Sequence, residues 1–115
     1  MDTIKLFKAL SDATRLRCVV LLASHDELCV CELTHALGLP QPKVSHHLAA
    51  LRKVGVVTDR KEGLWNYYRI RDGLPPWAHE VIRAAAEGVK SEAPFLHDAS
   101  ALGEMPNRPG GVCSA

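Results

Sequence analysis

The chain has 115 residues, enough for one domain built around a single hydrophobic core. Hydrophobic residues make up 47% and charged residues 23%, as in ordinary globular proteins, and the net charge of +1 excludes a generally basic protein but not a local basic face. No apolar run approaches the roughly 20 residues of a membrane span, and residues 1–10 are amphipathic rather than a signal segment, so we expect a cytoplasmic protein.

The first half of the chain has the periodicity of helices. "IKLFKAL" at residues 4–10 and "SDATRLRCVVLLAS" at residues 11–24 both place apolar side chains at helical spacing. Two further helices are expected, from Val30 to Leu37 and from Gln41 to Val54, with "GLPQ" breaking the pattern between them. Two short helices joined by a glycine-containing turn indicate a helix-turn-helix.

The periodicity changes after Gly55. "VVTDR" and "LWNYYRI" flank "KEG" and predict a β-hairpin, and "PPWAHEVIRAAAEGVK" predicts a last helix over residues 75–90. From Ser91 onward small and polar residues dominate, although Phe95 and Leu96 could dock locally. This order predicts a mainly α fold with a β-hairpin wing, namely a winged helix-turn-helix over residues 1–90, followed by a flexible tail over residues 91–115.

Two cysteines stand one residue apart in "ELCVCEL", at the expected start of a helix. Cys29 and Cys31 cannot comfortably bond to each other because so short a ring strains a disulfide. A chain with a good core also does not need disulfide staples. Reduced thiols are therefore expected, and these serve as metal ligands, nucleophiles or core filler.

The helix from Gln41 to Val54 has the features of a DNA-reading helix. Val44, Leu48 and Leu51 share one side, which must pack on the core, while polar side chains suited to base edges and phosphates gather near the N-terminus. The residues expected to bind DNA are Gln41, Lys43, Ser45 and His46 on this helix, with Arg60 and Lys61 on the wing. His47, at the boundary of the packed face, is expected to be a hydrogen-bonded structural histidine.

Five stretches together resemble the ArsR/SmtB family of bacterial metal-sensing repressors, and more narrowly its arsenite-responsive branch: "LFKALSDATRLRCVVLL", "ELCVCEL", "GLPQPKVSHHLAALRKVGVV", "DRKEGLWNYYRI" and "PPWA". The resemblance runs from about Leu6 to Ile82. It implies a homodimeric repressor that binds double-stranded DNA at an inverted-repeat operator of a resistance operon. It also implies an As(III) or Sb(III) inducer, bound by Cys29 and Cys31, whose binding releases the DNA, with no catalytic cofactor and no membrane partner.

The sequence departs from the pattern of this branch at one position. A third cysteine commonly follows the second by three residues, and Thr34 stands there in this sequence. Arsenite prefers three soft ligands, so a small thiol or hydroxide could complete the site, or Cys113 or Cys18 could contribute. Because residues i and i+2 of a helix lie about 200° apart, an ion gripping Cys29 and Cys31 is expected to unwind that turn and so disturb the recognition helix.

The resemblance also implies a dimer interface built from the first and last helices. These helices carry more apolar surface than a small core plausibly consumes, and exposed patches of that kind mark interfaces. The residues expected there are Ile4, Phe7, Leu10, Trp77, Val81, Ile82, Ala85 and Val89.

Three alternatives remain open from the residues. The repressor could sense cadmium, lead, zinc or thiol oxidation, although two thiolates alone suit soft thiophilic ions better than zinc. The chain could be a DNA-binding module whose cysteines are structural. A small thiol enzyme is disfavoured, because no nucleophile–base constellation accompanies Cys29, and Glu27 and Glu32 would raise its pKa.

Overall fold

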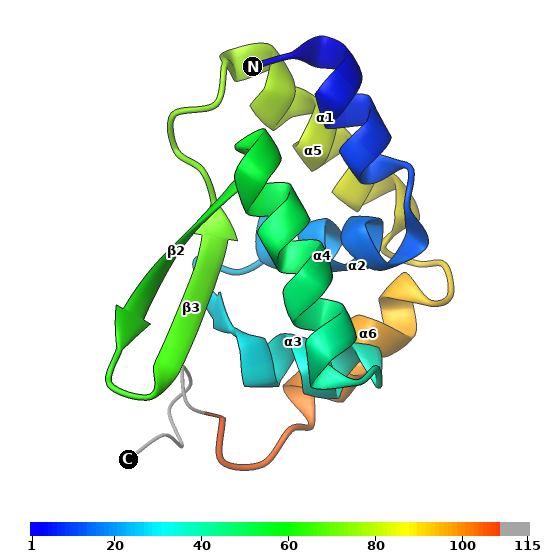
Figure 1. The fold of residues 1–115 in the computed structure, drawn as a ribbon. Coiled ribbons are helices and arrows are strands. Elements are labelled where there is room, and N and C mark those ends of the chain that lie inside the picture. The colour runs from blue at the N-terminus through cyan, green and yellow to red at the C-terminus, as the bar shows by residue number, and fades with distance from the viewer. Residues whose placement is uncertain (109–115) are drawn as a thin grey trace.

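The computed structural model describes residues 1–108, which form a helical body with a projecting hairpin (Figure 1). Its elements are α1 (Thr3–Leu10), α2 (Ala13–Ala23), β1 (Leu28–Cys29), α3 (Val30–Leu37), α4 (Gln41–Val54), β2 (Val57–Glu62), β3 (Trp65–Ile70), α5 (Pro76–Val89) and α6 (Phe95–Gly103). The predicted winged helix-turn-helix is confirmed: α3 and α4 form the helix-turn-helix, and β2 and β3 form the wing. Within the described residues no helix is long and apolar enough to cross a membrane.

Local sequence signals account for most helix boundaries. The Asp12 carboxylate caps α2 by accepting from the Arg15 backbone N–H at 3.0 Å. Gly38 ends α3 with φ 65° and Gly55 ends α4 with φ 93°, a left-handed conformation that glycine adopts without strain. Gly38 therefore sets the sharp turn that directs α4 away from α3.

The core fixes one face of α4. Val44, Leu48 and Leu51 are fully buried, as predicted, and pack with Leu33 of α3 in the central apolar cluster. Figure 1 shows α4 lying across the front of the helical body with its length accessible from outside. Packing through one side leaves the opposite side of the helix free to meet a partner.

A short strand that the sequence analysis did not predict ties the start of α3 to the wing. The sheet is antiparallel with the order β1-β3-β2, and β1 pairs Leu28 with Tyr68 and Cys29 with Tyr67. The hairpin turns at Gly63, where φ is 60°. The residue that begins α3 is therefore hydrogen-bonded into the same sheet as the wing.

The prediction of a flexible tail from Ser91 is wrong for residues 95–103, which form α6. This helix packs on α2 and α3, with Leu102 fully buried. The Asp98 carboxylate accepts from Arg17 Nη2 at 2.7 Å and from Arg17 Nε at 2.8 Å, and Arg17 Nη2 also donates to the Leu37 carbonyl at 2.9 Å. The sequence around α6 is locally weak as a helix, and contacts with distant elements stabilise it.

We expect Asp98→Ala to lower the free energy of unfolding by about 2–3 kcal/mol, because it leaves the Arg17 guanidinium largely buried and without its carboxylate partner. Urea denaturation followed by circular dichroism measures this change. Glu87→Ala, which removes the partner of Lys90 in an exposed ion pair, is the control and should change the free energy of unfolding far less. Equal effects of the two substitutions would contradict an anchoring role for Asp98.

Candidate functional site

The two neighbouring thiols lie at the junction of β1 and α3. Cys29 is the N-cap of α3 with extended backbone angles, and Cys31 is the second residue inside the helix. The expectation that both side chains project from one helix, about 200° apart, is therefore wrong. Because Cys29 precedes the helix, its thiol lies close enough to Cys31 to interact with it. One ion can thus contact both sulfurs without the helix first unwinding.

Cys29 takes the place that serine or threonine holds in an ordinary capping box. The Glu32 backbone N–H points at the Cys29 side chain, and the Glu32 carboxylate accepts from the Cys29 backbone N–H at 2.8 Å. The spacing Cys29-x-x-Glu32 matches a capping box with sulfur in place of a hydroxyl, a signal that was present in the sequence. The first turn of α3 therefore depends on the position of this thiol.

Burial governs the chemistry of Cys29. Its side chain is 1% exposed, and burial raises the pKa of the thiol well above its ordinary value, with Cys31 beside it adding to the rise and the Glu32 N–H opposing it. The thiol is therefore protonated at neutral pH. Cys31 is partly exposed, so the pair is approached from the Cys31 side.

Glu32 also connects this turn to the C-terminal segment. Its side chain is fully buried, and its second carboxylate oxygen accepts from Arg108 Nε at 2.7 Å. A buried carboxylate needs such a partner, since an unpaired charge in the core is costly. The ion pair holds the chain after α6 against the start of α3.

The described residues do not supply a third thiolate. Cys18 is buried in α2, where burial raises the pKa of its thiol to about 12, and residues 1–108 contain no group of three His, Cys, Asp or Glu side chains placed to hold a metal. Cys18 is therefore not brought to the pair, and Cys113 lies outside the described residues. The Thr34 hydroxyl, one helical turn after Cys31, is buried without a hydrogen-bond partner.

The polar face of α4 is accessible, as expected for a surface that meets DNA. Gln41, Lys43 and His46 are exposed and Ser45 is half-buried. Gln41 Nε2 donates to Ser45 Oγ at 2.8 Å, so these two side chains are oriented together. The small residue Ala49 continues this face and permits close approach to a groove.

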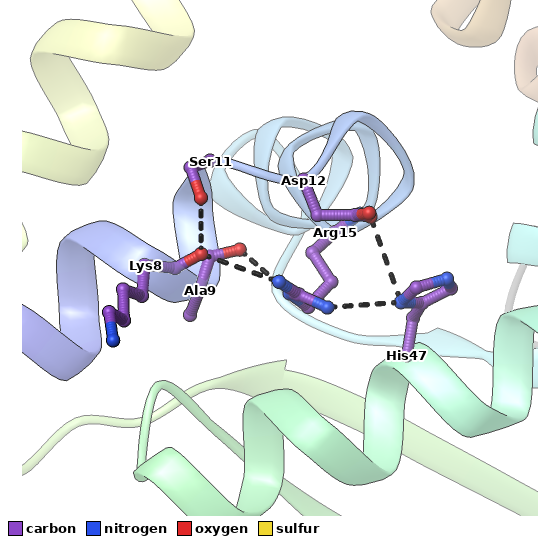
Figure 2. A network of polar contacts seen from close by, with 6 residues as sticks. All are labelled: Lys8, Ala9, Ser11, Asp12, Arg15 and His47. Atoms are coloured by element: carbon purple, nitrogen blue, oxygen red, sulfur yellow. Dashed lines mark hydrogen bonds and ion pairs between the residues drawn. The ribbon is translucent and has the colours of Figure 1, made fainter.

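A polar network at the back of α4 joins it to the α1–α2 junction (Figure 2). Arg15 Nε donates to the Ala9 carbonyl at 2.9 Å, and Arg15 Nη1 lies 3.4 Å from His47 Nδ1. The Asp12 carboxylate lies 3.7 Å from the same ring nitrogen, and burial lowers the pKa of His47. The predicted structural role of His47 is confirmed, and the connecting residue that sequence reasoning missed is Arg15.

The wing places its two predicted DNA contacts differently. Lys61 is exposed on β2. Arg60 instead donates to the Glu27 carboxylate through Nε at 2.8 Å and Nη2 at 2.7 Å, and to Glu62 through Nη1 at 2.8 Å. The Arg60 guanidinium is thus engaged by two carboxylates of the protein itself.

The residues predicted to form a dimer interface divide into two groups. Ile4 is 65% exposed, Phe7 49% and Trp77 41%, which is unusual for large apolar side chains. Ile82 is 3% exposed and belongs to the core, so its assignment to the interface is corrected. The remaining predicted residues are partly buried: Leu10, Val81, Ala85 and Val89.

Comparisons with known proteins identify relatives of this chain. The model of the "Bacterial regulatory protein, arsR family" matches residues 12–59. The chain is 46% identical to the arsenic resistance transcriptional regulator ArsR1 of Pseudomonas putida, over 90% of this chain and 79% of that one. It is 51% identical to the arsenical resistance operon repressor of Escherichia coli, over 71% and 70% of the two chains. The solved AntR antimony-specific transcriptional repressor is 28% identical with a TM-score of 0.64, over 76% and 77%.

The match to these relatives covers most of the chain, and the relatives are transcriptional regulators rather than enzymes. The chain belongs to the arsR family of bacterial regulatory proteins, and it is a DNA-binding repressor of the arsenic-resistance type with a winged helix-turn-helix.

Proposed function

We propose that this protein represses a resistance operon in the cytoplasm by binding an inverted-repeat operator, and that As(III) or Sb(III) releases it by binding Cys29 and Cys31. The observation that carries the proposal is the position of Cys29, which caps α3 and also pairs with β3 of the wing. A ligand that captures this sulfur acts on both DNA-facing parts of the fold. The paired soft sulfurs suit a thiophilic metalloid.

The binding step is a ligand exchange that needs no oxidant. Arsenous acid, As(OH)₃, meets two thiols; two As–S bonds form, two As–O bonds break, and the thiol protons leave with the hydroxides as two water molecules. The third position keeps its hydroxide or exchanges it for another thiol. Cys113 follows Arg108 by five residues, a reach of at most ~18 Å, and Arg108 is bound to the thiol turn through Glu32.

Release of DNA follows from the lost cap of α3. A Cys29 sulfur bonded to arsenic can no longer accept the Glu32 N–H in the same geometry, so the first turn of α3 changes. Because α3 packs on α4, this change alters the angle at which α4 meets the operator. Inducer and operator are then linked through one element with two arrangements.

The central test is a pair of serine variants. Cys29→Ser and Cys31→Ser should each bind the operator like the parent yet stay bound when arsenite is added, since a hydroxyl cannot replace the thiolate that arsenic needs. Fluorescence anisotropy of labelled operator, titrated with arsenite, measures both properties. Cys113→Ser and Cys18→Ser decide the third ligand: a variant that weakens arsenite binding without affecting repression identifies it, and two parent-like variants indicate a hydroxide or a small thiol at that position. A double variant, Cys29→Ser with Cys31→Ser, that leaves the operator at the parent's arsenite concentration would refute the scheme.

Proton balance separates a metalloid inducer from a divalent cation such as cadmium. Exchange of neutral As(OH)₃ with thiols releases no net proton, whereas Cd²⁺ must displace a proton from each thiol that it binds. Burial keeps the Cys29 thiol protonated through neutral pH, because its pKa is raised. Between about pH 6 and 8 we therefore expect arsenite affinity to stay nearly constant and Cd²⁺ affinity to rise about tenfold or more per pH unit. Competition titrations at several pH values measure this, and an arsenite affinity that climbs equally steeply would contradict the stated exchange.

The DNA-facing side of α4 gives a separate prediction. Lys43→Ala, Ser45→Ala and His46→Ala should each weaken operator binding by ~1–3 kcal/mol while leaving the fold intact, because each removes a contact to a base or phosphate. Electrophoretic mobility shifts with operator and unrelated DNA distinguish base contacts, whose loss weakens binding to the operator alone, from phosphate contacts, whose loss weakens binding to both. Lys90→Ala, at the end of α5, is the matched loss of a surface charge and should change little. Parent-like binding by His46→Ala would remove that residue from the interface.

We further propose that the protein acts as a homodimer through α1 and α5. An inverted repeat requires two recognition helices related by a two-fold axis. The exposed side chains of Ile4, Phe7 and Trp77 supply an apolar patch for this contact. Phe7→Glu should shift the dimer toward monomer and weaken operator binding, which sedimentation velocity at micromolar concentration measures. A parent that sediments only as monomer would exclude this interface.

A further inference from the structure

The geometry points to Arg60 as a residue that couples the thiol turn to the wing, acting through Glu27, rather than as a contact to the DNA backbone. The inference rests on the proposed function and adds a second route for release, from Cys29 to the wing, beside the route through α3 and α4. It concerns the part of the sheet where β1, β3 and β2 lie next to one another.

One row of residues crosses all three strands. Cys29 pairs with Tyr67 in the β1–β3 ladder, and Tyr67 pairs with Arg60 in the β2–β3 ladder. Directly paired residues point to the same face of a sheet, so the thiol and the guanidinium lie on one face with the Tyr67 ring between them. Arg60 Cζ lies 4.6 Å from the centroid of that ring, within the range of a cation–π contact.

Glu27 binds Arg60 at the end of this row, and we call the Glu27–Arg60 ion pair the clamp. Glu27 lies two residues before Cys29, and its two carboxylate oxygens accept from Arg60 Nε and Nη2 at 2.8 and 2.7 Å. The bond spans the central strand, from the residue preceding β1 to the middle of β2. Strand β1 has only two residues and therefore few ladder bonds, so this bidentate ion pair adds a second connection between the thiol turn and the wing.

The local charge argues against a phosphate contact. The Arg60 guanidinium is shared by the carboxylates of Glu27 and Glu62, so the three groups together carry a net negative charge. A DNA phosphate brought to this place would have to displace one carboxylate and would be repelled by the other. Lys61, the next residue, carries no such carboxylate partner among the described residues and remains the better wing contact.

Capture of the Cys29 sulfur by a metalloid would move β1, and the clamp would carry that movement to β2. The wing then changes its position relative to α4, and the two no longer fit the operator together. Removing the clamp should leave arsenite able to bind the thiols while reducing how strongly that binding opposes DNA binding. The strength of this opposition is the coupling between the two sites, and the ratio of arsenite affinities in the free protein and in the operator complex measures it.

The test measures arsenite affinity in the free protein and in the operator complex, and takes the ratio, for the parent, Glu27→Gln, Arg60→Met and the double variant. Arg83→Met is the control: Arg83 lies on α5, is exposed, and pairs with Glu80 of the same helix instead. We expect Glu27→Gln and Arg60→Met to lower the ratio by a similar factor, about three- to fivefold, with no further fall in the double variant. Arg83→Met should leave the ratio unchanged.

Two results would overturn the inference. One is an unchanged ratio in both clamp variants. The other is an Arg60→Met variant that loses operator affinity, with a salt dependence reduced by about one phosphate contact, while Glu27→Gln keeps the parent's affinity, as expected if Arg60 binds the backbone. A parent that does not leave the operator with arsenite would instead refute the proposed function, and that failure shows before any variant is compared.

Discussion

The reciprocal cap between Cys29 and Glu32 is the interaction on which the arrangement of the site depends. Cys29 ends a strand and begins a helix, and the Glu32 carboxylate holds its backbone N–H at 2.8 Å. The same carboxylate binds Arg108, so a single buried side chain fixes the thiol turn, the start of α3 and the segment after α6. Elements distant in the chain thus share one point of attachment beside the sulfurs.

Because of this attachment, the geometry of α3 depends on its contacts with other parts of the molecule. It is short, with eight residues, and its ends are held by different parts of the molecule: the thiol turn at its start, and Arg17 at the Leu37 carbonyl at its end. A short helix has little stability of its own and takes its geometry from what it packs against. A change at either end is therefore passed to α4 rather than absorbed within α3.

The elements predictable from sequence were those whose signals are local. Gly38 and Gly55 mark helix ends, the spacing of Val44, Leu48 and Leu51 defines the buried side of α4, and all of these agree with the structure. What escaped prediction depends on partners far along the chain. Two residues of β1 carry no recognisable period, and α6 depends on the pairing of Asp98 with Arg17, which lies 81 positions away.

In the candidate site, too, features with local sequence signals were predictable and those that depend on distant residues were not. The two cysteines and the exposed side of α4 were identifiable by residue type and spacing. The ion pair of Arg60 was not, because its charge suggested a phosphate contact and only the folded sheet places Glu27 against it. Ile82 was misassigned for a similar reason. An apolar residue at its position in the helix could belong to the core or to an interface, and only the packing of the folded chain places it in the core.

The burial of Cys29 also acts as a filter on what can reach it. A hydrated divalent cation or a charged oxidant loses favourable interactions with water when it enters an apolar site, whereas an uncharged acid of the size of As(OH)₃ loses far less. A protonated thiol is in addition a poor nucleophile toward electrophiles that meet it by chance. In the proposed mechanism, the same burial that lets sulfur cap a helix protects the thiol from common reactive species, while As(OH)₃ is a small neutral ligand that brings its own leaving groups.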